Sequence, residues 1–313
     1  NKKNNIKNIL ILIFVSFFVL ISFNFYVINN NGIKNRLPEF FHKDLRAKKV
    51  NFHQKDNTQK VISIGDSHAR ALEYILNEEI KKKDLSLIGF KTLFYLTDFN
   101  IVIKKTGKIN QNFIDRNMKI DNFLKENSNL IVVFHQRWAL KLLETHFDNE
   151  EGDKEMDDLE YGIYLEPINI KTSSLKERQK YIKEGLVYQF NKIINQGHKL
   201  ILVYPVPEMG FHPIRLLYRK HLFEQNFSNN SLPILSSSYE VYKKRNELIF
   251  EILDSIQNPN IFRVYPHNFF CDTIIKDRCV ANDKNKIFYF DDDHLSTHGS
   301  KLVAREIINK INP

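Results

Sequence analysis

Short apolar runs alternate with helical patterns along most of the chain. Continuous runs of this kind are typical of strands buried on both faces of a sheet. The predicted strands are residues 61–64, 85–90, 130–134, 199–204, 261–265 and 287–290. The predicted helices are residues 69–80, 113–124, 175–194, 239–256 and 297–311. This alternation predicts one α/β domain over residues 59–313, with a mainly parallel sheet between two helical layers.

The N-terminal region has a different pattern. Residues 9–28 form one apolar run in which sixteen of twenty positions are Ile, Leu, Phe or Val, on every side of a helix. A buried amphipathic helix would keep a polar face, and a cleaved signal peptide usually ends in small residues, which are absent here. The length fits a bilayer core of roughly 30 Å, so we expect an uncleaved transmembrane helix at 9–28.

The flanks of this run indicate its orientation. Lysines precede it within residues 1–8, which are expected to form a cytoplasmic flank, whereas the Asn- and Lys-rich residues 29–58 are expected to form a linker. By the positive-inside rule the large domain lies on the opposite side of the membrane. Cys271 and Cys279, the only two cysteines, could close a short disulfide loop there; two unpaired thiols are the alternative.

Composition narrows the function classes. The formal net charge is +9, from 46 basic and 37 acidic residues, but the basic residues are dispersed and not interleaved with aromatic residues. This distribution argues against a nucleic-acid partner. Two cysteines exclude a multi-cysteine zinc site, and no glycine-rich nucleotide-binding loop is present.

A reactive segment follows the first predicted strand. Gly65-Asp66-Ser67-His68 falls where the strand gives way to a helix, at the edge of the sheet where α/β proteins bind ligands. Gly65 permits a tight turn, and the backbone N–H of Ser67 is one of the unpaired donors at a helix start, which can stabilise an oxyanion. A simple helix cap by Asp66 or Ser67 is the alternative.

A second reactive segment precedes the last predicted helix. A hydroxyl needs a base, and an imidazole works as one when an acceptor holds its other nitrogen. In Asp291-Asp-Asp-His294 the carboxylate three residues before the histidine can reach back, which favours Asp291 over its neighbours. A metal site made by His294, His298 and the aspartates is the alternative, although the HExxH pattern is absent.

Together the two segments resemble the SGNH/GDSL hydrolase superfamily. Gly65-Asp66-Ser67-His68 is similar to its first block, with Ser67 as nucleophile, and Asp291 to His294 is similar to its last block. The stretch from Cys271 through Cys279 to His294-Leu-Ser-Thr-His-Gly299 resembles, more closely, the SGNH domain fused to membrane acyltransferases of acyltransferase family three. The fold expected from this resemblance is the SGNH, flavodoxin-like α/β/α sandwich.

The middle of the chain departs from the superfamily pattern. The superfamily's GxND block is missing, and His135-Gln136-Arg137-Trp138 follows the third strand instead. The candidates for the second oxyanion donor or for substrate contact are therefore Gln136, Arg137, Trp138 or a backbone N–H. Gly65 and Asp66 are further candidates for these roles. Gly89 is a weak candidate for the superfamily's second block.

The resemblance implies a function. An acyltransferase domain that spans the membrane several times, upstream in the chain or in a partner, would deliver acetyl groups, and Ser67, His294 and Asp291 would pass them to a hydroxyl of a cell-surface glycan. This places the protein in a bacterial inner membrane with its catalytic domain outside, and it requires neither metal nor other cofactor. A carbohydrate O-acetyl esterase and an inactive glycan-binding domain are the alternatives.

Overall fold

The computed structural model describes residues 2–30, 32–33, 45, 48–154, 162–223 and 231–311. The chain divides into two compact units, Asn1–Lys43 and Asp44–Pro313. The first unit contains helix α1 (Lys2–Asn29). Within the described residues this helix holds the one stretch long and apolar enough to cross a membrane, Ile6–Asn29. The predicted span of residues 9–28 lies inside it.

The second unit is built on a five-stranded parallel sheet, which confirms the predicted α/β class. The strand order is β2-β1-β4-β6-β8. The strands are β1 (Lys60–Gly65), β2 (Ser86–Lys91), β4 (Ile131–His135), β6 (Lys199–Val203) and β8 (Ile261–Val264). Because β1 lies between β2 and β4, the chain reverses its winding direction beside β1, which is where ligands bind in such sheets.

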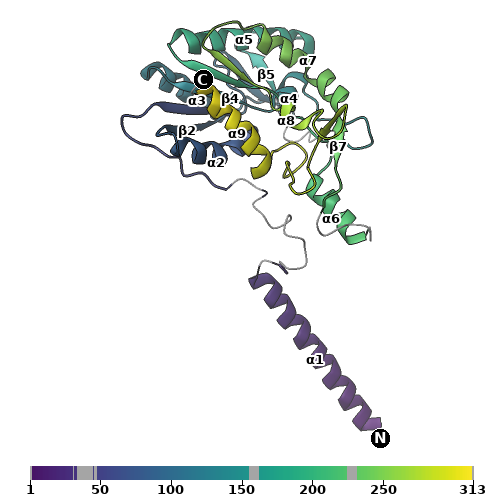
Figure 1. Ribbon diagram of the computed structural model, residues 1–313. Helices are drawn as coiled ribbons and strands as arrows, with labels where there is room; N and C mark the ends of the chain where they lie inside the picture. Colours follow the sequence, from purple (N-terminus) through teal and green to yellow (C-terminus); the bar gives the residue numbers. More distant parts are fainter. Residues whose placement is uncertain are drawn as a thin grey trace. The chain divides into compact units, whose positions relative to one another are not determined.

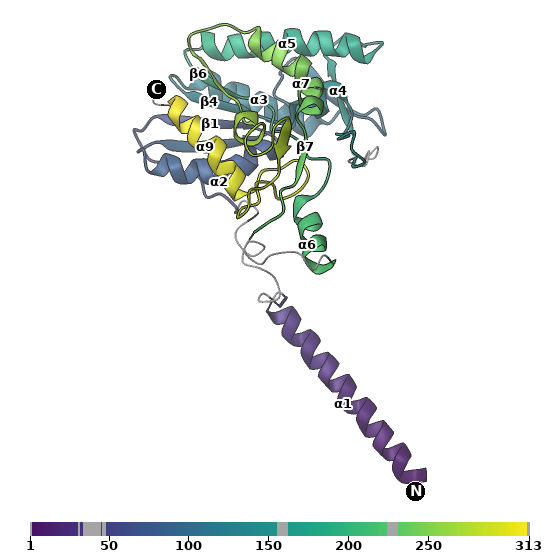
Figure 2. The ribbon, with the colours of Figure 1, turned by 45° about the vertical axis from the view of Figure 1, so that its right-hand side comes forward.

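Helices cover both faces of this sheet (Figures 1 and 2). On one face α2 (Ser67–Lys81) and α9 (Thr297–Ile311) lie side by side. On the other face α3 (Gln111–Glu126), α5 (Leu175–Asn195) and α7 (Tyr239–Asp254) contribute to one large core with inward residues of the strands, among them Ile62, Val132 and Leu200. Alternation of side chains along each strand therefore supplies both layers.

Local signals set several helix ends. Ser174 and Ser238 precede α5 and α7, and their hydroxyl oxygens accept the N–H groups of Glu177 and Val241. Such caps satisfy donors that have no partner within the helix. Gly197, the predicted stop of the long helix, has a φ of +83° and follows α5 closely. A residue with a side chain would be strained in this left-handed conformation.

Several elements were not predicted. β3 (Phe99–Ile103) pairs antiparallel with β5 (Ile163–Pro167), and β7 (Ser236–Ser238) pairs antiparallel with β9 (Arg278–Val280). Three further helices were also missed: α4 (Trp138–Leu143), α6 (Pro213–Phe223) and α8 (His267–Phe270). Most of these elements are too short for periodicity to identify them.

The predicted strand at residues 287–290 is wrong. This segment makes isolated bridges, Asn282 to Ile287 and Tyr289 to Leu295, and joins none of the sheets. Its apolar side chains are buried or nearly so, as in a strand, because the segment folds back on its own turn: the N–H of Phe290 donates to the carbonyl of His294 at 3.0 Å. Burial without a neighbouring strand produced the misleading pattern.

Part of the predicted linker belongs to the second unit. The N–H of His53 donates to Asn77 Oδ1 on α2 at 2.7 Å, and the carbonyl of His53 accepts the N–H of Leu87 on β2 at 2.8 Å. Residues 48–58 therefore pack on the domain. Residues 31, 34–44 and 46–47 of the linker lie outside the described residues.

Candidate active site

The serine turn is fixed by close contact between β1 and β4. A Cβ atom at Gly65 would lie 1.7 Å from the carbonyl oxygen of His135, so only glycine fits. Asp66 caps α2: its Oδ1 accepts the N–H of His68 at 2.9 Å, and its Oδ2 accepts the N–H of Arg137 at 3.0 Å. Asp66 thus ties the turn to the segment after β4, and Ser67, the first residue of α2, is exposed.

The histidine turn is organised by Asp291. Its Oδ1 accepts the N–H groups of Asp293 and His294, at 3.2 and 2.7 Å. Both carboxylate oxygens of Asp291 also lie 3.0 Å from His294 Nδ1. The contact across three residues that the sequence suggested is therefore present, and it leaves Nε2 as the nitrogen available for a substrate or a nucleophile.

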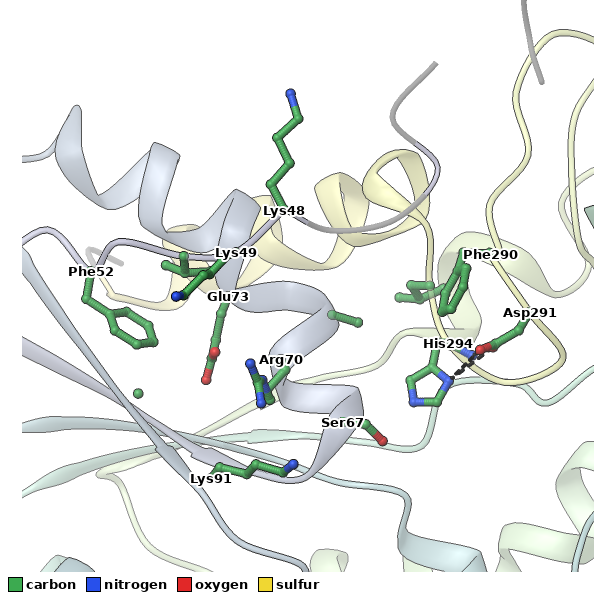
Figure 3. A pocket seen from close by; sticks show the side chains of 14 residues that line it. Lys48, Lys49, Phe52, Ser67, Arg70, Glu73, Lys91, Phe290, Asp291 and His294 are labelled. Carbon is green, nitrogen blue, oxygen red and sulfur yellow. Dashed lines mark hydrogen bonds and ion pairs between the residues drawn. The ribbon is translucent and has the colours of Figure 1, made fainter. Parts of the chain in front are cut away.

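Ser67 and His294 line the same pocket. This pocket has a volume of about 660 Å³ and is also lined by Asp291, Arg70 and Lys91. Figure 3 shows the Ser67 hydroxyl pointing toward the side of the pocket that holds the imidazole. Among the described residues, His294 Nε2 has no hydrogen-bond partner, so the two groups face one another without a closed hydrogen bond.

A second carboxylate contacts the same histidine. Asp293 Oδ1 lies 2.6 Å from His294 Nδ1, while Asp293 Oδ2 lies 3.1 Å from His68 Nε2 and 2.9 Å from Arg137 Nη1. Burial alone would raise the pKa of Asp293, but hydrogen bonds from His294 and His68 and the charge of Arg137 hold it well below its ordinary value. Asp293 therefore stays ionised in the interior.

The charged network continues behind Asp293. Arg137 Nε donates to Glu208 Oε1 at 2.7 Å, and Arg245 Nε donates to Glu208 Oε2 at 2.6 Å. Burial would raise the pKa of Glu208, but the two guanidinium groups lower it. We name this set (His68, Asp293, Arg137, Glu208 and Arg245) the buried charge network. The sequence offers one signal for this network: a charged residue follows the end of each of two strands, Arg137 after β4 and Glu208 after β6.

The protonation of His294 follows from these contacts. Burial opposes a charge on the ring, but hydrogen bonds to Asp291 and Asp293 outweigh this effect and raise the pKa of His294 to about 10. The resting ring therefore carries a proton on both nitrogens near neutral pH. Its neutral form, which can accept a proton from a hydroxyl, becomes more abundant as the pH rises.

The other predicted contact residues lie elsewhere. Among the described residues that line the pocket with Ser67 there is no Gln136, Arg137 or Trp138; these three line a separate small cavity with Glu208 and Asn246. Trp138 is 1% exposed and its indole N–H donates to the carbonyl of Val203 at 3.0 Å, so it is a core residue. A role for Gln136 or Arg137 as the second oxyanion donor stays a prediction; both amide atoms of Gln136 are buried without a hydrogen-bond partner among the described residues.

Gly89 does line the pocket. It lies on β2, and a Cβ atom there would come within 2.3 Å of the Phe52 ring and 2.8 Å of Glu73 Oε1. The glycine thus leaves room for the side chains that close this end of the pocket.

The two cysteines are also paired. Cys271 and Cys279 form a disulfide, as one of the two alternatives from the sequence predicted.

Two groups of side chains have the composition of a metal site. His68, Asp293 and His294 place one ligand atom each within 4.8 Å of one another, as do Asp291, Asp292 and Asp293. His298 belongs to neither group. In the first group Arg137 already neutralises Asp293, and the carboxylates already hold His294 Nδ1, so the donor set suits a proton-transfer network better than a divalent cation.

Fold and site together define a class. It is a parallel α/β domain in which a serine begins the helix after the first strand, and a histidine just before the last helix lines the same pocket. The family model described as SGNH domain (fused to AT3 domains) matches residues 38–309. The chain belongs to this family.

Comparison with solved structures agrees on the fold. The chain is similar to the periplasmic domain of a lipopolysaccharide acetyltransferase of Salmonella ser. Paratyphi A, with a TM-score of 0.53. The sequence identity is 17%, and the match covers 83% of this chain and 85% of that one. No curated protein matches the sequence.

Proposed function

We propose that this protein transfers an O-acyl group, specifically acetyl, to a hydroxyl of a cell-surface glycan through an ester on Ser67. One observation carries the proposal: His294 lines the same pocket as Ser67, Asp291 holds its Nδ1, and its buried Nε2 has no hydrogen-bond partner among the described residues. This is the arrangement that a Ser-His-Asp triad needs.

The reaction has two steps. Ser67 Oγ attacks the carbonyl carbon of the acyl donor, neutral His294 takes the hydroxyl proton at Nε2, and the donor's leaving group departs with that proton. His294 then takes the proton of a sugar hydroxyl, whose oxygen attacks the Ser67 ester. The glycan ester is released and the proton returns to Ser67. The backbone N–H of Ser67, at the start of α2, stabilises the oxyanion in both steps.

The location proposed is the outer side of the inner membrane. Three features support it: the apolar helix α1, the disulfide between Cys271 and Cys279, and the likeness to the periplasmic domain of a lipopolysaccharide acetyltransferase. Since the family's domains are fused to AT3 domains, we infer that such a membrane domain, in the same chain or in a partner, supplies the acetyl group.

The experiment is a comparison of Ser67→Ala with Ser128→Ala in the full chain, in cells that acetylate their surface glycan. Ser128 serves as the matched control. It is an exposed serine that precedes β4, at the amino end of this strand, whereas Ser67 follows the carboxyl end of β1. We expect Ser67→Ala to abolish glycan acetylation and Ser128→Ala to leave it unchanged. Normal acetylation with Ser67→Ala would contradict the proposal and would favour a glycan-binding role.

An esterase is the second candidate, since Ser67 is exposed and water can reach its ester. The products distinguish the two: an esterase releases acetate from an acetylated oligosaccharide, whereas a transferase moves labelled acetyl from a donor to the oligosaccharide. Release of acetate without transfer by the protein with its acyltransferase domain would decide for the esterase.

A further inference from the structure

The pocket that contains Ser67 is rich in basic side chains. Lys49, Arg70 and Lys91 all line it (Figure 3). Arg70 lies one helical turn after Ser67 on α2, and Lys91 is the register partner of Gly65 across the β1–β2 pair. Two of these cations therefore flank the serine turn from two different elements.

The three cations of the pocket differ in their ion pairing from the lysines at the end of α2. Lys81 and Lys82, at the far end of α2, form ion pairs with Glu78 and Glu79 at 2.8 and 2.9 Å. Within the described part of the chain, Lys49, Arg70 and Lys91 take part in no ion pair and no side-chain hydrogen bond. Three like charges around one pocket repel each other, and a bound anion would relieve that repulsion.

The acidic groups of the pocket do not cancel these charges. Asp291 is engaged with His294. Glu73 is buried, and burial raises its pKa more than the hydrogen bond from Ser63 and the charge of Arg70 lower it. Lys49, Arg70 and Lys91 outnumber Glu73 and Asp291 even when both carboxylates are ionised, so the pocket has an excess of positive charge beside the proposed nucleophile.

We infer that the pocket binds an anionic group of the acceptor glycan, a sugar carboxylate or phosphate, between Arg70 and Lys91. Arg70 supplies the planar pair of donors that matches such an oxyanion, and Lys91 adds a point charge. The hydroxyl to be acetylated is then held near Ser67 and His294. This inference deepens the proposed function and rests on it, but its binding step can be measured without any acyl transfer.

The test measures binding to the full chain in detergent by calorimetry, with three probes. These are trigalacturonic acid, its carboxyl-reduced neutral counterpart, and that same neutral trisaccharide with one 6-phosphate added. We expect the wild-type protein to bind at least one charged probe about tenfold more tightly than the neutral one, the factor expected for one or two partly exposed ion pairs. The carboxylate and phosphate arms show which anion is preferred.

Three variants complete the test. Arg70→Gln/Lys91→Gln should lose the preference for charged probes, while Lys81→Gln/Lys82→Gln, which removes the same charge outside the pocket, should keep it. Ser67→Ala should also keep it although acylation is lost, so failure of the catalytic proposal and failure of this one are distinguishable.

Several results would overturn the inference. They are equal binding of charged and neutral probes by the wild-type protein, an unchanged preference in Arg70→Gln/Lys91→Gln, or an equal loss in Lys81→Gln/Lys82→Gln.

Discussion

The two sides of His294 handle charge in opposite ways. Behind the ring, the carboxylates and guanidinium groups of the buried charge network meet partners of opposite sign at 2.6 to 2.9 Å. In front of the ring, the exposed cations Lys49, Arg70 and Lys91 line the pocket that contains Ser67. The first arrangement holds groups in place, and the second leaves charge available for a ligand.

This difference has an energetic origin. A buried ion loses its hydration, so it must be paired, and removing one partner leaves an uncompensated charge. An exposed ion keeps its hydration, so an unpaired lysine costs the fold little. We therefore expect changes behind the ring to affect stability and proton transfer, and changes in front to affect ligand binding.

The largest effect is expected for Arg137→Met. Arg137 lies between Asp293 and Glu208, and its loss leaves both buried carboxylates short of a partner. We expect the free energy of unfolding to fall by about 3–5 kcal/mol. Urea unfolding followed by the fluorescence of Trp138, the chain's one tryptophan, measures this.

Arg70→Met is the matched control for that experiment, because Arg70 is exposed in the pocket. We expect its unfolding free energy to stay within about 0.5 kcal/mol of the wild-type value. Equal losses for the two variants would contradict the distinction between the two sides.

The next effect concerns the disulfide. Cys279 on β9 pairs with Ser237 on β7, whose hydroxyl donates to the carbonyl of Glu208 at 3.2 Å. Cys271→Ser/Cys279→Ser should lower the free energy of unfolding by about 2–3 kcal/mol by the loop-entropy model. The same urea experiment without reductant measures this loss. An unchanged midpoint would show that the disulfide does not stabilise the domain.

The smallest effect is a change in pH dependence. Neutral His294 is the form that accepts a proton, so hydrolysis of p-nitrophenyl acetate should increase with pH toward the pKa of about 10. Asp293→Asn removes one of the two carboxylates that raise this pKa, so the increase should occur at lower pH. A profile identical to wild type would show that Asp293 does not act on His294.

The raised pKa of His294 also makes the stability of the fold depend on pH, and stability decreases over the pH range in which activity is expected to increase. Since the pKa of His294 is raised above its ordinary value of 6.5, the charged ring stabilises the fold fully below pH 6.5. This contribution is lost as the pH increases through about 10. Activity at high pH is therefore expected to come with reduced stability, which thermal unfolding at pH 7 and pH 10 measures.

Much of the fold was predictable because its signals are local. The strands β1, β4, β6 and β8 are apolar runs, and α9 was predicted with the bounds that it has. The contact between Asp291 and His294 spans only three residues, so a turn suffices to form it. The segment 287–290 was misread because burial by a turn gives the same pattern as burial in a sheet.

The sequence by itself determined the parallel α/β architecture, the apolar N-terminal helix and the chemistry available at each end of the domain. Only the tertiary structure decided that Asp293 contacts His68 and Arg137, and that Lys91 lies beside the serine turn. The physical reason is the range of the contacts. A helix or turn is specified by residues within four positions of one another. The residues of these pairs are 26 to 225 positions apart in the sequence. Their contacts therefore depend on the order in which the strands pair and on which segments meet at the edge of the sheet.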